Sequence, residues 1–209
     1  MKVFFASLLP SLLLTALITA SCSQPPLSEP QDEGVIIRGT EYNENSYHID
    51  VRDAGLTSDD IQSLTRVNDL LVLTLDNHEI DDISIIGELT SLSSLSLRNN
   101  NIRDISPLKN LAKLNWLNLS NNNIKDISAL QNMSELTHLI LYENQIEDIT
   151  ALKGMTNLNH LDLRENNISD ISALSGLSSL QTLNLSGNPV SSEQIDELLS
   201  ILTDCHLFE

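Results

Sequence analysis

The chain has 209 residues, of which 41% are hydrophobic, so it is long enough to bury a core and too apolar for the disordered class. Its 29 Asp and Glu residues outnumber 11 Lys and Arg residues, which gives a net charge of −18. Because a nucleic-acid ligand needs a basic stripe that neutralises its phosphates, this balance excludes nucleic acid as a partner, and we expect one folded domain.

Residues 1–21 have the pattern of a signal peptide. Lys2 precedes an uncharged, apolar stretch that runs from Val3 to small residues just before Cys22, which is the order of regions in an export signal. Because the stretch, at about 19 residues, could nearly span a bilayer, an uncleaved membrane anchor is the alternative.

The residues around the predicted cut, Thr19-Ala20-Ser21-Cys22, resemble a bacterial lipoprotein cleavage site, with Thr19 where Leu is usual. The resemblance implies that the chain is cut before Cys22, that lipid is attached to its thiol, and that the lipid anchors the protein in a bacterial cell envelope. Because Ser23 stands where an Asp would retain such a protein at the inner membrane, the resemblance favours the outer membrane, on its periplasmic or its outer surface. The alternative is an ordinary signal peptide, an incidental cysteine and a secreted protein.

Residues 22–34 are expected to form a flexible tether between the lipidated cysteine and the folded domain. They contain Pro25, Pro26 and Pro30 and lack any aromatic or β-branched residue, so they cannot build a core. Such a segment holds a folded module away from a membrane surface.

Residues 35–66 are predicted to form an N-terminal cap and a degenerate repeat. One template length before Leu73 in the first regular block lies Val51, which is therefore in phase with it. Terminal repeats are atypical because one of their faces has no neighbour that buries it. We expect the segment from Val35 to Ile37 to cover the outward-pointing Leu71 and Val72.

Residues 67–198 contain six consecutive blocks that share the 22-residue template L-x-x-L-x-x-L-x-L-x-x-N-x-I-x-D-I-x-x-L in fixed phase, which is typical of a solenoid. The alternation of Leu95 and Leu97 predicts a short strand in each block, and strands from successive blocks should stack as a parallel sheet. The Asn of the template, for example Asn144, is expected to bond to backbone groups that no strand partner reaches. His78 takes this place in the first block.

A column of Asp residues recurs in the second half of the template. One interpretation is calcium coordination by the carboxylates, and the other is capping of the short turn that returns the chain. The strict placement of the Asp at the start of the turn favours capping. The column comprises Asp82, Asp104, Asp126, Asp148 and Asp170.

The C-terminal end is predicted to form a cap at residues 199–209, after apolar residues at helical spacing that indicate a helix over 191–202. Cys205 lies one template length beyond Leu183, so we expect its side chain to point inward from a last strand. This burial would protect a thiol that is left unpaired if Cys22 carries lipid.

The repeats resemble those of the leucine-rich repeat family, and the 22-residue form with N-x-I-x-D-I is similar to that of bacterial internalin-type adhesins. The resemblance covers about residues 45–209. It implies an α/β repeat solenoid with a curved parallel β-sheet on the concave face, short 3-10 or turn segments on the convex face, and a C-terminal capping helix and strand. It also implies that the concave face binds other proteins and sometimes glycans.

Side chains that alternate with the strand leucines point out onto the predicted concave face. A sheet that buries its other side needs no exposed Trp, Ile or Tyr for stability, whereas protein interfaces concentrate binding energy in Trp, Tyr and Arg. We therefore predict a partner-binding patch with Glu143 and Glu165 at its rim; the alternative is the ordinary scatter of apolar residues over a surface. The residues of the predicted patch are Arg98, Trp116, His138, Ile140, Tyr142, His160, Asp162 and Arg164.

His138 and His160 on adjacent predicted strands, with Asp162 nearby, raise the alternative of a zinc site and a metal-dependent enzyme. Side chains of neighbouring strands on a flat sheet point the same way and rarely converge on one ion, so we expect no metal and no cofactor. The sequence also lacks a Ser-His-Asp constellation, a phosphate loop and a nucleophile turn, and we expect a monomeric binding module without enzymatic activity. A third hypothesis is a structural envelope protein without a discrete ligand.

Overall fold

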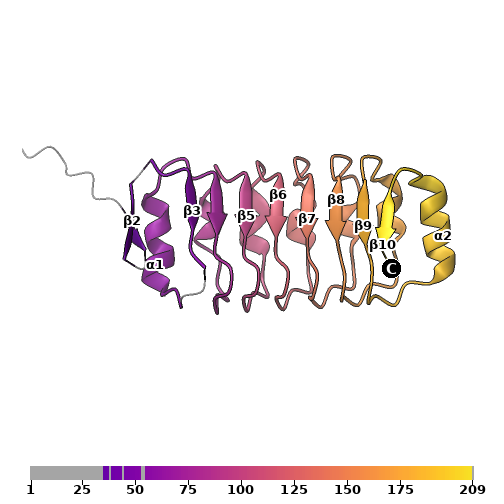
Figure 1. Ribbon diagram of the computed structural model, residues 1–209, viewed down its shortest axis with the longest axis horizontal. Coiled ribbons are helices and arrows are strands. Elements are labelled where there is room, and N and C mark those ends of the chain that lie inside the picture. Colours follow the sequence, from indigo (N-terminus) through magenta and orange to yellow (C-terminus); the bar gives the residue numbers. More distant parts are fainter. Residues whose placement is uncertain (1–34, 38, 44, 53–54, 209) are drawn as a thin grey trace, which may run out of the picture. The chain divides into compact units, whose positions relative to one another are not determined.

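The computed structural model describes residues 35–208 with the exception of residues 38, 44 and 53–54, and these residues belong to one compact unit, Asp32–Glu209 (Figure 1). The predicted signal peptide, Cys22 and the tether lie outside the described residues. Among the helices of the described part, none combines the length and the apolarity that crossing a membrane requires.

A parallel sheet of eight short strands runs along this unit, and neighbouring strands pair in chain order (Figure 1). In β6, Leu117 is fully buried while Trp116 and Asn118 on the opposite face are partly exposed, which confirms the predicted alternation. The strands are β3 (His48–Asp50), β4 (Val72–Thr74), β5 (Ser94–Ser96), β6 (Trp116–Asn118), β7 (His138–Ile140), β8 (His160–Asp162), β9 (Thr182–Asn184) and β10 (His206–Phe208).

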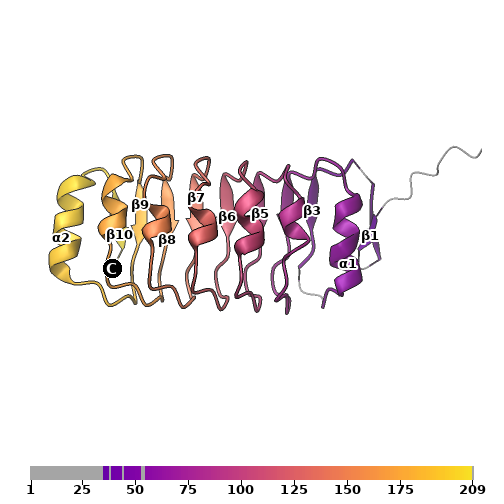
Figure 2. The same cartoon turned by 180° about the vertical axis from the view of Figure 1, so that it is seen from behind.

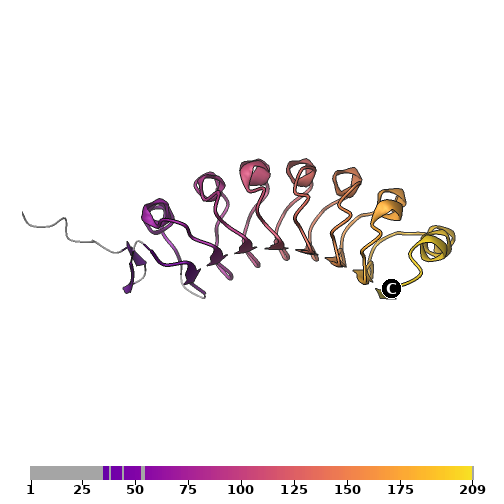
Figure 3. The same ribbon diagram turned by 90° about the horizontal axis from the view of Figure 1, so that it is seen from above.

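Short helical segments line the side of the unit opposite the sheet (Figure 2). Viewed along the strands, the coils follow an arc with the strands on the inner, concave side and the helical segments on the outer, convex side (Figure 3). This arrangement is the predicted α/β repeat solenoid. The helical segments are α1 (Ser58–Ser63), η1 (Leu64–Arg66), η2 (Ile86–Glu88), η3 (Ser106–Asn110), η4 (Ser128–Leu130), η5 (Thr150–Leu152), η6 (Ser172–Gly176) and α2 (Ser192–Ile201).

Asparagines of the template form a buried ladder where each strand ends. Asn144 donates from Nδ2 to the carbonyl oxygens of Leu119 and Leu141, both at 3.0 Å, and accepts from the amide of Ile124 at 3.0 Å. The predicted role of the Asn column, which is to satisfy backbone groups that have no strand partner, is therefore confirmed. In the first block, the His78 side chain is buried, Nε2 contacts the Val51 carbonyl at 3.0 Å, and Nδ1 has no hydrogen-bond partner among the described residues.

The Asp column supports the turns on the convex side. Oδ1 of Asp104 accepts a hydrogen bond from the amide of Ser106, the first residue of η3, at 2.8 Å, and the other four members repeat the contact. Because Asp104 precedes Ile105, the residue at the N-cap position, the carboxylate caps the turn from one residue further out than predicted. Within the described residues, no group of three or more His, Cys, Asp or Glu could hold a metal ion, so calcium coordination finds no ligand set there.

The first and last coils are two residues longer than the repeat template predicts. Ile49, not Val51, pairs with Leu73, and Leu207, not Cys205, pairs with Leu183. Both coils contain an α-helix where the central coils have 3-10 turns, and an α-helix rises less per residue, so it takes more residues to return the chain.

Two burial predictions at the ends of the unit are wrong. Cys205 precedes β10 and is only half-buried, because the longer coil moves Leu207 into the inward position. The hairpin β1 (Val35–Ile37) and β2 (Thr40–Tyr42) packs on α1 and buries Val35 and Ile37. It therefore leaves Leu71 uncovered, with 42% of its surface exposed.

Candidate functional site

The predicted patch lies on the concave face of strands β6, β7 and β8. The parallel register places Trp116, His138 and His160 side by side as the first residues of these strands. The rings of His138 and His160 are stacked with centroids 5.9 Å apart, and Thr137 contacts Nδ1 of His138 through its hydroxyl at 2.9 Å. The structure therefore brings the three ring side chains into one row.

Ile140 and Asp162 occupy the third position of β7 and β8 and are also paired in register. Ile140 is half-buried, whereas Asp162 is only 8% exposed. An apolar side chain thus lies between the histidine row and the residues that follow the strands, and the Asp162 carboxylate is largely covered.

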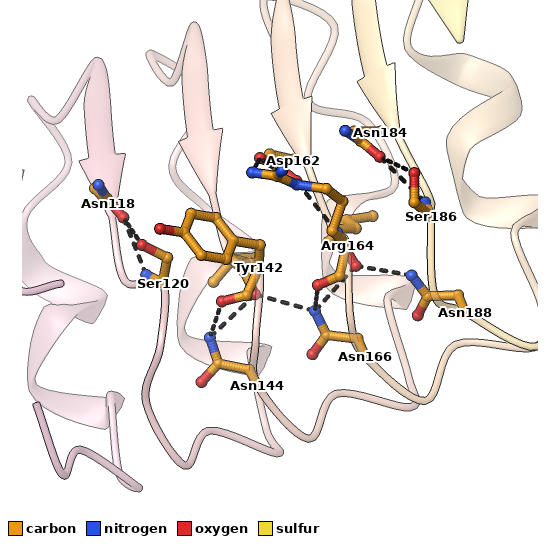
Figure 4. Close-up of polar contacts among 12 residues, drawn as sticks. Asn118, Ser120, Tyr142, Asn144, Asp162, Arg164, Asn166, Asn184, Ser186 and Asn188 are labelled. Carbon is orange, nitrogen blue, oxygen red and sulfur yellow. Dashed lines mark hydrogen bonds and ion pairs between the residues drawn. The ribbon is translucent and has the colours of Figure 1, made fainter. Parts of the chain in front are cut away.

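Arg164 is held between Asp162 and Tyr142 (Figure 4). Its Nε donates to both carboxylate oxygens of Asp162, at 3.0 and 3.1 Å, and its Nη2 donates to Oδ2 at 2.7 Å. The guanidinium carbon lies 4.7 Å from the centroid of the Tyr142 ring, within the range of a cation–π contact. Despite these contacts, 41% of the Arg164 side chain remains exposed.

The pKa of Arg164 is raised, first by the hydrogen bonds to Asp162 and then by the charge of that carboxylate, with smaller contributions from Tyr142 and Glu143; partial burial opposes the shift. The guanidinium is therefore a fixed positive charge on a chain with a net charge of −18. Bidentate geometry and stacking also restrict its orientation, which a lysine at this position would not reproduce.

Asp162 has a scaffold role that the sequence pattern did not reveal. In the neighbouring coils, Asn118 and Asn184 accept hydrogen bonds from the amides of Ser120 and Ser186 at 3.0 and 3.1 Å, and from their hydroxyls at 2.6 and 2.7 Å (Figure 4). Asp162 likewise accepts from the amide of the residue two positions on, at 3.2 Å, and adds the guanidinium contacts. A carboxylate at this template position followed by Arg two residues later is the signal that could have indicated the pair.

Arg98 is not brought into the cluster. It lies on the coil of β5, two coils before Tyr142, with Ser120 between them in the same column. Its backbone amide donates to Asp76 at 2.9 Å, and its side chain is exposed. The structure thus places Arg98 at the N-terminal margin of the predicted patch.

Glu143 and Glu165 border the patch in left-handed backbone conformations, with φ of 54° and 50°. The same column holds Asn99 and Asn121 in earlier coils, where the side-chain Nδ2 of Asn121 donates to Oδ1 of Asn99 at 2.7 Å. Asn tolerates positive φ better than Glu does, so the two glutamates carry a local backbone cost that the asparagines avoid. A Cβ at Gly187 would lie 2.6 Å from the Glu165 carboxyl carbon, so that glycine leaves room for the carboxylate.

The positions of His138, His160 and Asp162 do not favour the metal-dependent alternative. The Asp162 carboxylate is hydrogen-bonded to the Arg164 guanidinium, and the described residues contain no group of three His, Cys, Asp or Glu suited to a metal ion. His138 and His160 thus lack the third protein ligand that catalytic zinc sites have.

Comparisons with known proteins agree with this architecture. A leucine-rich repeat family model matches residues 148–190, and a model for two copies of the repeat matches residues 112–154. A comparison with proteins of curated function gives no match.

Among solved structures, an internalin (inlF) from Listeria monocytogenes is 33% identical with a TM-score of 0.70, over 77% of this chain and 46% of that one. The chain therefore spans less than half of that internalin. Internalin C2 from the same organism is 28% identical with a TM-score of 0.63, over 78% of this chain and 80% of the other. A leucine-rich repeat protein of Leptospira interrogans, 22% identical with a TM-score of 0.58 over 71% of this chain and 45% of that one, shares the fold. The chain thus contains leucine-rich repeats and forms an α/β solenoid similar to those of the internalins.

Proposed function

We propose that the chain is a binding module that engages a partner protein through Trp116, His138, Ile140, Tyr142, His160 and Arg164 on its concave face. Solenoids use such extended concave surfaces for binding. The main observation behind the proposal is the orientation and exposure of Arg164. Its side chain is oriented by Asp162 and Tyr142, yet 41% of it remains exposed.

The energetic argument rests on preorganisation. Association normally immobilises long side chains, at a cost of about 0.5–1.5 kcal/mol for each. Arg164 is already immobilised by three hydrogen bonds and a stacked ring, so a partner that contacts it avoids most of this cost. Trp, Tyr and Arg are also the residue types that most often dominate binding energy in protein interfaces.

The patch is also dispensable for the core. Leu117, Leu139 and Leu161, which alternate with the patch residues, are fully buried on the other side of the sheet. Removing Trp116 and Tyr142 should therefore leave the fold intact, which makes the proposal testable by substitution.

The test compares two double variants for capture of a protein from cell-envelope extract. Trp116→Ala with Tyr142→Ala should abolish capture while the circular dichroism spectrum is unchanged. The matched control, Ser94→Ala with Thr182→Ala, changes the equivalent first strand position outside the patch and should capture normally. Capture that survives in the first variant removes the proposed patch. Absence of capture by the unmodified chain removes the binding proposal and favours a structural role without a discrete ligand.

We further propose that the module is anchored by lipid at Cys22, with residues 22–34 as tether. Residues 35–66 would then be an N-terminal cap and a degenerate repeat, residues 67–198 the six repeats and residues 199–209 the C-terminal cap. The support is the Thr19-to-Cys22 sequence and the composition of the tether. Cys22→Ala should eliminate metabolic labelling with a lipid analogue and release the protein from membranes. Retained label in that variant would refute the anchor and leave the binding proposal untouched.

A further inference from the structure

A shallow groove of about 450 Å³ lies where the chain enters strands β3, β4, β5 and β6, outside the concave patch. Its residues come from equivalent positions of successive coils. Tyr47 and Leu71 directly precede β3 and β4. Asn45 lies two residues before Tyr47, and Asp69 lies two residues before Leu71. The groove crosses three strand spacings of about 4.8 Å, so it is about 14 Å long.

The floor of the groove is apolar and exposed at Tyr47 and Leu71, and Ser93 continues the same column as a polar residue. Tyr47 has 68% of its surface exposed and Leu71 has 42%, which places both among the few large hydrophobic residues that the described part of the chain leaves open to solvent. In that same part, the Tyr47 hydroxyl makes no hydrogen bond. A ligand with an apolar face can therefore stack on the ring and still reach a free polar group at its tip.

The rim of the groove combines neutral and charged polar groups. Asn45 and Ser91 supply an amide and a hydroxyl, Asp69 supplies a carboxylate, and Lys113 supplies an ammonium group. Asp69 is held at a φ of 54°, and neither its carboxylate nor the Lys113 amine has a partner within the described residues. Donors and acceptors thus both line the rim beside the apolar surface of Tyr47 and Leu71, and the formal charges of Asp69 and Lys113 sum to zero.

This chemistry selects one ligand class. A peptide strand would need unpaired backbone groups, but the Tyr47 carbonyl already accepts from the amides of Leu71 and Val72, both at 2.9 Å. An anion would meet Asp69, and a cation would meet Lys113. Sugars have apolar C–H faces and hydroxyls that both donate and accept, which matches the floor and the rim. We propose that this groove binds a neutral oligosaccharide of two or three sugar units, independently of the concave patch.

The experiment titrates the purified chain with maltotriose, cellotriose and chitotriose. NMR records the transfer of saturation from protein protons to sugar protons at up to about 10 mM sugar, which covers millimolar affinity. At least one trisaccharide should receive saturation from Tyr47. Tyr47→Ala, which removes only an exposed ring, should lower the affinity by about tenfold or more with an unchanged circular dichroism spectrum. Asp69→Asn, which retains a residue type suited to positive φ, should also weaken binding.

Trp116→Ala serves as the control, because it disables the concave patch and should leave sugar binding unchanged. The proposal is overturned if none of the three trisaccharides receives saturation, or if Tyr47→Ala binds as tightly as the unmodified chain. Sugar binding that is lost in Trp116→Ala but kept in Tyr47→Ala would place the glycan on the concave patch and also overturn it.

Discussion

Replacement of Asn144 by Ala tests the physical basis of the repeat. The side chain is 8% exposed and makes three hydrogen bonds of 3.0 Å, together with a longer one of 3.4 Å to the Tyr142 carbonyl. The substitution removes all four bonds and fills part of the space with a methyl group.

The structure distinguishes which backbone groups are left without a partner. The carbonyl of Leu119 also accepts from Asn122, and that of Leu141 also accepts from Asn166, each at 3.0 Å, so both keep one bond. The amide of Ile124 has no second acceptor among the described residues. One orphaned buried donor costs about 1–3 kcal/mol, and weakening two carbonyl contacts adds to it, so we expect a loss of about 2–3 kcal/mol.

The assay is urea unfolding followed by circular dichroism, in which the midpoint should fall while the slope is unchanged. Asn123→Ala is the matched control, because this neighbouring side chain only accepts from Gln145 at 3.4 Å and should shift stability by less than about 0.5 kcal/mol. Equal midpoints for Asn144→Ala and the unmodified chain would refute the reasoning about the Asn ladder.

Three further predictions concern single side chains. His78→Asn should raise the free energy of unfolding by about 1 kcal/mol, because it replaces a ring with an unpartnered buried Nδ1; a urea midpoint that falls would contradict this. Burial raises the pKa of the Cys205 thiol, so iodoacetamide should alkylate it more slowly at about pH 8 than it alkylates free cysteine, and a faster rate would be inconsistent with the packing. The amide and hydroxyl of Ser128 lower the pKa of Asp126, so this carboxylate stabilises the fold above its unfolded pKa and the contribution is lost as the pH falls through the depressed folded value. Urea midpoints of Asp126→Asn should consequently fall less steeply than those of the unmodified chain between about pH 5 and pH 2, and parallel curves would exclude the effect.

The repeat period allowed the central coils to be predicted residue by residue. The buried leucines of the strands, the Asn ladder and the Asp contacts at the turns all follow from columns in the sequence, because each repeated coil meets a neighbour with the same template residues. The same period failed at both ends. There the coils meet a cap instead of another repeat, and their α-helices add two residues that no periodic count contains.

The sequence predicted which side chains of the candidate site lie on the concave face but not the contacts among them. The outward columns identified Trp116, Tyr142 and Arg164 from strand alternation alone. Contacts among side chains on one face depend on their rotamers, which the sequence does not show. Asp162 could therefore not be recognised as the group that orients Arg164. The exposed floor at Tyr47 was also missed, since the lengthened first coil shifts the register there.

Site-specific photocrosslinking tests the central claim most directly. A photoreactive phenylalanine derivative in place of Trp116 should yield one dominant adduct with a partner protein in envelope extract. The same derivative in place of Lys109, which is exposed on the convex turn η3, should yield none above background. Adducts of equal abundance from both positions, or from Lys109 alone, would contradict the assignment of binding to the concave face.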